Sequence, residues 1–178
     1  TDNRRQRQMC IRDRSSTEAT PLCDKWVLWA HLPHDTDWSL KSYIQIMQVE
    51  SMEEVIALYN SVPPAMVKNC MLFLMRQNIK PMWEDPNNKQ GGCFSFKVTN
   101  KNVPDVWKSV SYLLTGESLA NDKNFQNNVT GITISPKKSF CILKIWMKSL
   151  EFQNPRVITN VNGLQIGGCL FKKHKPNY

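Results

Sequence analysis

The sequence predicts an α+β domain, in which a curved, mostly antiparallel sheet of seven to eight strands carries two to three helices on its convex face. Most apolar runs are short and bounded by turn residues, which is typical of strands. Only a few segments have apolar residues at helical spacing, and they are inserted between the strands. One hairpin joins two consecutive strands, which indicates antiparallel pairing.

The chain of 178 residues with a formal charge of +8 fits one domain over residues 20–178. Residues 1–19 are rich in arginine, lack apolar periodicity and are expected to be a disordered basic tail. The charge favours a polyanionic partner such as nucleic acid or a nucleotide triphosphate. Six cysteines without a C-x-x-C pair indicate reduced thiols in a cytoplasmic protein. No apolar run is long enough for a membrane span.

The strands are expected where apolar or alternating runs occur, and ordered structure should begin near Pro21. The predicted strands are 26–32, 43–48, 71–75, 93–99, 129–134, 140–147 and 164–171. Trp26 and Trp29 differ by an odd number, so they should point to opposite faces of the first strand. A glycine pair in the last strand suggests a bulge or bend there.

Two of the expected helices can be placed along the chain. The first covers 51–60, because Ser51 and Glu54 have the spacing of a capping box. The second begins near Pro104 and ends before Gly116, with apolar residues at helical spacing between them. The polar residues 117–128 are expected to form a loop.

A loop around Trp83 and Glu84 is the clearest candidate for a binding site. Proline stands on both sides of the pair, and the segment runs into Gly91-Gly92. An indole beside acids in a loop indicates that a ligand stacks on it. Glu84 can accept two parallel hydrogen bonds from adjacent N–H groups, as guanine presents. Trp38 lies in an equally polar segment, so the two tryptophans and Glu84 together predict a guanine clamp.

Two other classes of function would need different features in the sequence. A general single-stranded RNA module would use Trp38 and Trp83 as stacking platforms without a preference for base methylation. An enzyme acting on nucleotides is disfavoured, because the sequence has no glycine-rich phosphate loop and no metal-ligand spacing. His31, His34 and His174 are scattered and are interpreted as structural or surface residues. We therefore expect a protein that is not an enzyme, with no metal and no cofactor.

With these residues in place, the sequence resembles the mRNA cap-binding translation initiation factor 4E family over about two-thirds of its length. The matching signatures are Trp26-x-x-Trp29, Trp38, Ala57-Leu58-Tyr59-Asn60, Pro81-Met82-Trp83-Glu84-Asp85 with Asn88-Lys89 and Gly91-Gly92, Leu113-x-x-Gly116-Glu117-Ser118 and Ile145-Trp146. The resemblance implies a cupped antiparallel sheet with helices on its convex side. It also implies support for translation initiation through capped mRNA.

The resemblance implies that 7-methylguanine is sandwiched between Trp38 and Trp83, that Glu84 holds its N1–H and N2–H groups, and that Trp146 lies near the methyl group. Methylation makes the purine a cation, which gains about 0.5 to 2 kcal/mol on each indole face. A charge-assisted pair of bonds to Glu84 adds about 1.5 to 3 kcal/mol. Together these terms favour methylated over plain guanine.

The phosphate-binding residues depart from the family pattern. The family's hairpin arginine aligns with Lys137, and Ile142 replaces a lysine, while Lys144 occupies the same strand face. Lys137 and Lys144 are therefore expected to bind the phosphates. Further candidates are Lys138, Lys172, Lys173 and Lys175. Lysine lacks the arginine fork, so binding should be more sensitive to salt.

The partner surface departs further, because Ile56 stands where the family has a tryptophan and Lys108 replaces a leucine. We expect Pro21, Met52 and Ile56 to receive the amphipathic helix of a scaffold or regulatory protein. The changes leave open a cap-binding repressor with the same site. Outside its complexes the protein is expected to be a monomer that does not bind membranes.

Overall fold

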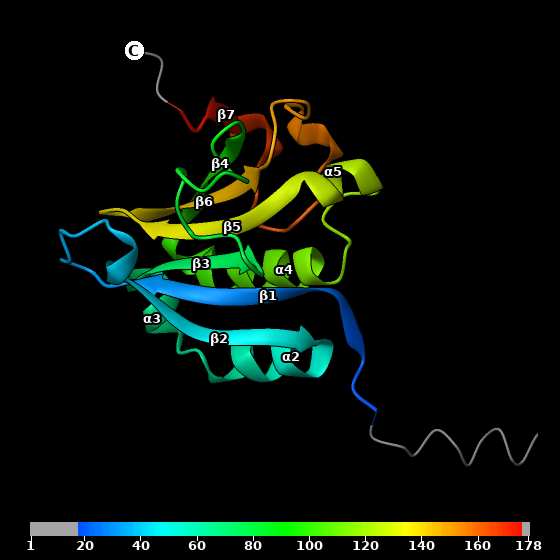
Figure 1. The fold of residues 1–178 in the computed structure, drawn as a ribbon. Helices are drawn as coiled ribbons and strands as arrows, with labels where there is room; N and C mark the ends of the chain where they lie inside the picture. Colours follow the sequence, from blue (N-terminus) through cyan, green and yellow to red (C-terminus); the bar gives the residue numbers. More distant parts are fainter. Residues whose placement is uncertain (1–17, 176–178) are drawn as a thin grey trace, which may run out of the picture.

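The computed structural model describes residues 18–175, which form a seven-stranded sheet in the order β2-β1-β3-β5-β6-β4-β7 (Figure 1). The strands are β1 (Pro21–His31), β2 (Tyr43–Ser51), β3 (Met71–Arg76), β4 (Gly92–Thr99), β5 (Val129–Pro136), β6 (Phe140–Met147) and β7 (Leu170–Lys173). All neighbouring pairs are antiparallel, as predicted. The expected tail falls almost entirely outside the described residues.

The last predicted strand is wrong in its extent. Residues Ile166–Gly168 form a 3-10 turn, in which the Cys169 N–H donates to the Ile166 carbonyl at 3.1 Å, and only Leu170–Lys173 pair with β4. The segment predicted as one strand has two parts. Leu164 is buried in the core, whereas β7 pairs with the edge of β4.

The two long helices are confirmed as α2 (Met52–Ser61) and α4 (Val103–Thr115). The Ser51 hydroxyl accepts a hydrogen bond from the Glu54 N–H at 3.2 Å, as the capping box requires. Two further α-helices of six residues each, α3 (Pro64–Asn69) and α5 (Lys123–Asn128), bring the α-helices of the described residues to four. Both are too short to show helical periodicity. Helix α5 corrects the second half of the predicted loop over 117–128.

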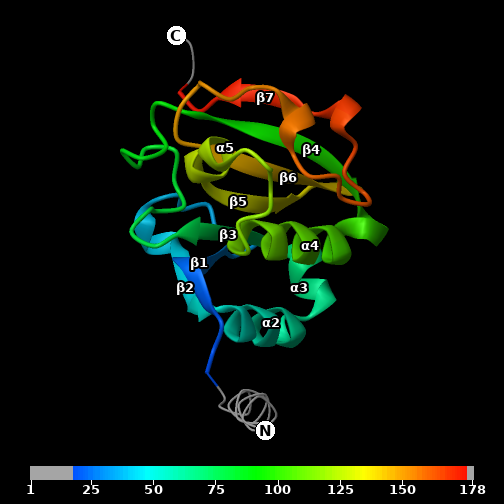
Figure 2. The same cartoon turned by 90° about the vertical axis from the view of Figure 1, so that its right-hand side faces the viewer.

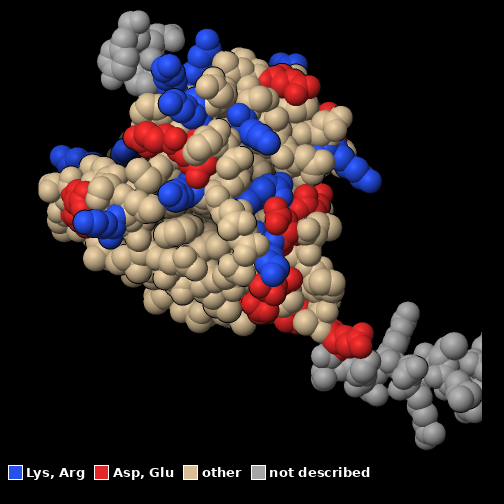
Figure 3. Space-filling view, viewed as in Figure 1, with Lys and Arg blue, Asp and Glu red and all other residues tan. Residues whose placement is uncertain are grey.

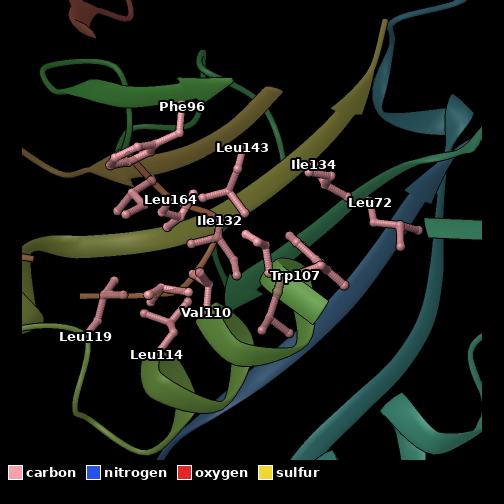
Figure 4. Packing of buried hydrophobic residues seen from close by; sticks show 14 of the residues in the cluster. Leu72, Phe96, Trp107, Val110, Leu114, Leu119, Ile132, Ile134, Leu143 and Leu164 are labelled. Atoms are coloured by element: carbon pink, nitrogen blue, oxygen red, sulfur yellow. The ribbon is translucent and has the colours of Figure 1, made fainter. Parts of the chain in front are cut away.

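Helices α2, α3 and α4 lie on one face of the sheet (Figure 2). Trp107, Val110 and Leu114 of α4 are buried against apolar side chains of the sheet (Figure 4). Within residues 18–175, none of the helices is long and apolar enough to cross a membrane.

The other face carries a smaller apolar cluster built from Phe73, Met75, Cys93 and Trp146. Trp26 belongs to the core under the helices, whereas Trp29 packs against this smaller cluster, so the two point to opposite faces as predicted. Among residues 18–175, no α-helix lies over the second face, and the loops that follow β1 and β3 rise beside it (Figure 2).

Candidate functional site

A pocket of about 230 Å³, here called the aromatic pocket, lies on the helix-free face. Its lining consists of Trp38, Tyr43, Met71, Phe73, Pro81, Met82, Trp83, Glu84 and Trp146. Five parts of the chain meet here, namely the loop after β1, strand β2, strand β3, the loop after β3, and strand β6. The structure therefore brings together the three tryptophans and the acid that the sequence singled out.

The loop that carries Trp83 and Glu84 is held by two buried polar side chains. The Asp85 carboxylate accepts hydrogen bonds from the backbone N–H of Lys80 at 2.9 Å and of Asn87 at 2.8 Å. The Asn88 side chain, which is fully buried, donates to the Met82 carbonyl at 2.9 Å. These bonds fix the loop, while Glu84 remains exposed at its surface and, among the described residues, accepts no side-chain hydrogen bond.

Glycines are required where this loop rejoins the sheet. A Cβ atom at Gly91 would collide with the Met147 carbonyl, and one at Gly92 would collide with the Lys172 carbonyl. The Gly91-Gly92 pair is thus explained by close approach of neighbouring backbones rather than by a positive φ.

The loop that carries Trp38 is ordered by its own acidic side chains. Asp37 accepts from the Ser39 N–H at 2.8 Å and from the Ser39 hydroxyl at 3.0 Å, and these bonds lower the pKa of the Asp37 carboxyl. Trp38 itself is 54% exposed. Its ring lies parallel to that of His31, with centroids 3.9 Å apart. His31 is buried, and the prediction of a structural or surface residue missed this contact with the site.

Tyr43 packs against rings on both sides of the pocket wall. Its ring meets those of His31 and Phe73 edge-on, at centroid distances of 5.3 Å in both cases. Burial raises the pKa of the Tyr43 hydroxyl, and the charge of Glu84 raises it further. Tyr43 therefore contributes a neutral hydroxyl to the pocket. This role could not be inferred from the sequence, because Tyr43 occurs in an ordinary strand pattern.

A second pocket of about 460 Å³, the basic pocket, adjoins the first and shares Trp83 and Trp146 with it. Its remaining lining is Cys93, Ser95, Ser135, Lys137, Ile142, Lys144, Leu170, Lys172, Lys173 and His174. Basic side chains, drawn in blue, gather at the upper left of the molecule near the C-terminal end of the described chain (Figure 3). Four of the predicted phosphate-binding lysines meet here, whereas Lys138 and Lys175 do not line the pocket.

His174 lines the basic pocket beside Trp146. Its ring centroid is 4.7 Å from that of Trp146, and its backbone N–H donates to the Gly91 carbonyl at 3.0 Å. Burial, together with the charge of Lys144, lowers the pKa of His174 to about 4. The Nε2 atom is buried and has no hydrogen-bond partner among the described residues. The imidazole is therefore neutral near pH 7.

The predicted partner surface lies at α2. Pro21 pairs with Ser51, and the Met52 N–H donates to the Thr20 carbonyl at 2.9 Å, so the start of β1 lies beside the start of the helix. Ile56, one turn further along, is 45% exposed. Pro21, Met52 and Ile56 are thus close neighbours.

Comparison with known proteins identifies the family. The family model described as eukaryotic initiation factor 4E matches residues 21–167. The chain belongs to the eukaryotic initiation factor 4E family.

Among curated members, the chain is 30% identical over 138 residues to the initiation factor 4E of Eremothecium gossypii, covering 74% of this chain and 64% of that protein. A homologue from Acanthamoeba polyphaga mimivirus is 35% identical over 83 residues, which cover 47% of this chain and 27% of that protein. The chain thus spans less than two-thirds of the length of the initiation factor 4E proteins of Eremothecium gossypii, Candida albicans and Schizosaccharomyces pombe.

Solved structures of initiation factor 4E share the fold. The Ascaris suum protein, described as a complex with the m7G cap, has a TM-score of 0.67 at 22% identity, covering 79% of this chain and 78% of that one. The Schistosome protein, described as a complex with m7GpppG and 4E-BP, has a TM-score of 0.68 at 21% identity, covering 75% and 74% respectively. These likenesses confirm the predicted architecture.

Proposed function

We propose that residues 20–178 act as one domain that binds the 7-methylguanosine 5′ cap of mRNA in the cytoplasm and supports translation initiation, without catalysing a reaction. The observation that carries this proposal is the aromatic pocket, in which Trp38, Trp83, Trp146 and Glu84 meet beside a pocket lined by lysines. Membership of the initiation factor 4E family supports it.

The aromatic pocket would recognise the base. Trp38 and Trp83 would stack on its two faces, and a methylated guanine, being a cation, gains about 0.5 to 2 kcal/mol from each indole face. Glu84 would accept from N1–H and N2–H, which adenine cannot match. Trp146, at the floor between the two pockets, would lie near the methyl group.

The basic pocket would bind the phosphates. Lys137 and Lys144 line it from the β5–β6 hairpin and β6, and Lys172 and Lys173 line it from β7. A cap places its triphosphate directly beyond the guanosine, which suits two pockets that share a wall. Because lysine binds phosphate as a point charge, we expect binding to weaken as salt is added.

A protein partner would bind at the surface formed by Pro21, Met52 and Ile56. The exposed Ile56 suits an amphipathic helix. Near it, the Lys108 ammonium lies 3.4 Å from the Asn60 side-chain oxygen and 5.7 Å from the Tyr112 ring centroid. The Lys108 charge disfavours a partner whose helix needs an entirely apolar surface at this position. A repressor with the same cap site would differ only in its partners, which co-purification would reveal.

The proposal is tested by retention on 7-methyl-GTP resin for the wild type, Trp38→Ala and Glu84→Ala. Each variant should lose at least about tenfold in affinity, equivalent to about 1.4 kcal/mol. Glu50→Ala, which removes an exposed carboxylate of β2, is the matched control and should be retained like the wild type. Retention that neither site substitution changes would reject the assigned residues.

A further inference from the structure

The stack between His31 and Trp38 is the feature that the proposed function leaves unexplained. The two ring planes differ by 1°, and their centroids are 3.9 Å apart. His31 is only 2% exposed, whereas Trp38 is 54% exposed. A buried imidazole is thus held flat against an indole that faces solvent.

A hydrogen bond fixes the imidazole in this plane. His31 Nε2 lies 2.8 Å from the Asp37 carbonyl oxygen, which can only accept, so Nε2 carries the hydrogen. Asp37 directly precedes Trp38, so the bond ties the ring to the same loop that carries the indole. In the neutral imidazole this leaves Nδ1 as the nitrogen that can gain a second proton.

The stack leaves one face of the indole available. Trp38 lines the aromatic pocket and His31 does not, so the imidazole covers the indole face turned away from the pocket. An indole free to rotate would have to be ordered when a base binds, at a cost in side-chain entropy. The imidazole removes that freedom before the ligand arrives.

The charge of the imidazole matters as well as its shape. A neutral ring leaves the indole's π electrons available to a cationic base on the other face. An imidazolium would compete for the same electrons and would repel that base across the ring.

We infer that His31 is a positioning residue for Trp38, which holds the indole ready to stack on a positively charged base and weakens that stacking when it gains a second proton. This inference rests on the proposed function, because it concerns Trp38 as one wall of the base-binding pocket.

The groups that face His31 set the conditions of the test. Asp37 in the Trp38 loop attracts a protonated imidazole. Tyr43 on β2 meets the ring edge-on and is itself near Glu84. On β3 the paired residue is Met71, which does not titrate. Because Asp37, Tyr43 and Glu84 are present in any His31 variant, a matched variant cancels their contribution.

The experiment measures the affinity for 7-methyl-GTP by tryptophan fluorescence quenching at about pH 7.5 and about pH 5.5. The variants are His31→Phe, which keeps an aromatic ring but cannot gain a proton, and His31→Ala, which removes the stack. At the higher pH, His31→Phe should bind within about threefold of the wild type and His31→Ala about fivefold more weakly. At the lower pH, the wild type should lose about tenfold more affinity than His31→Phe.

A measurement without ligand checks the stack itself. The ring current of Trp38 should shift the NMR resonance of the His31 Cε1 hydrogen upfield, and Trp38→Ala should abolish the shift. An unchanged resonance would overturn the inference even if His31→Ala failed to fold.

The outcomes separate the inference from the function on which it rests. A wild type that prefers 7-methyl-GTP over GTP, with a pH dependence identical to that of His31→Phe, would overturn the role of His31 and leave cap binding intact. A wild type that does not bind 7-methyl-GTP would overturn both.

Discussion

The aromatic pocket and the basic pocket share two tryptophans but are built in different ways. In the aromatic pocket, Asp85 and Asn88 fix one loop through backbone hydrogen bonds, and His31 stacks beneath the tryptophan of the other. In the basic pocket, the four lysines have no carboxylate within 4.0 Å among the described residues.

This difference indicates that the two pockets contribute differently to binding. Rings and a carboxylate carried on ordered loops discriminate between bases, because such loops do not move to accommodate a mismatched base. Flexible lysines add attraction that depends on charge and on salt, with little discrimination. Substitutions in the first pocket should therefore change selectivity, and those in the second should change overall affinity.

The largest effect is expected for Trp83→Ala. Loss of one stacking face should weaken binding of 7-methyl-GTP at least about tenfold, while binding of GTP should change less because it lacks the cation. Isothermal titration calorimetry with both nucleotides measures this. Trp83→Phe, which keeps a smaller aromatic face, should fall between the wild type and Trp83→Ala, and equal losses for both nucleotides would contradict the role of the cation.

Glu84→Gln should cost about tenfold in affinity for 7-methyl-GTP, because a charge-assisted acceptor becomes a neutral amide. The same titration should show that discrimination against 7-methyl-ATP decreases. The matched control is Glu50→Gln, at an exposed carboxylate on β2. A Glu84→Gln protein with full selectivity for guanine would show that another group identifies the base.

Lys144→Ala and Lys137→Ala should each weaken binding about threefold, through the loss of one partly screened phosphate contact. Titrations at several salt concentrations should show a shallower salt dependence in both variants. Lys138→Ala is a matched control, because Lys138 is adjacent in the hairpin but does not line the pocket. If Lys138→Ala behaves like Lys137→Ala, the lysines act through general charge rather than through the basic pocket.

The smallest effect is expected for His174→Gln. The stability of this variant should differ from that of the wild type only in acid. Because burial lowers the folded-state pKa of His174 to about 4, the unfolded chain binds more protons between that value and about 6.5. The wild type should thus lose stability as pH falls through this range. Denaturant unfolding at about pH 7 and about pH 4.5 should show a smaller loss for His174→Gln, and equal losses would contradict the neutral imidazole.

Much of the fold and of the aromatic pocket could be predicted from the sequence. Trp83 and Glu84 stand in a proline-bounded loop, where an indole is not needed for core packing. Its presence there indicates that it stacks on a ligand. Ser51 with Glu54 places a helix directly, because capping is a local interaction.

What could not be predicted depends on distant contacts or on short segments. The contact of His31 with Trp38 depends on how the loop after β1 turns back. Hydrophobic periodicity in the sequence does not predict the conformation of such a loop. The exclusion of Lys138 from the basic pocket depends on the conformation of a hairpin tip. Helices α3 and α5 have six residues each, too few to show a pattern.

The central claim is that two indoles and one acid select a methylated, positively charged guanine. The most direct test is competition between 7-methyl-GTP and GTP for quenching of the wild-type tryptophan fluorescence at fixed salt. A preference of at least about tenfold for the methylated nucleotide is predicted from the cation–π contributions. Equal affinities for the two nucleotides would contradict the claim.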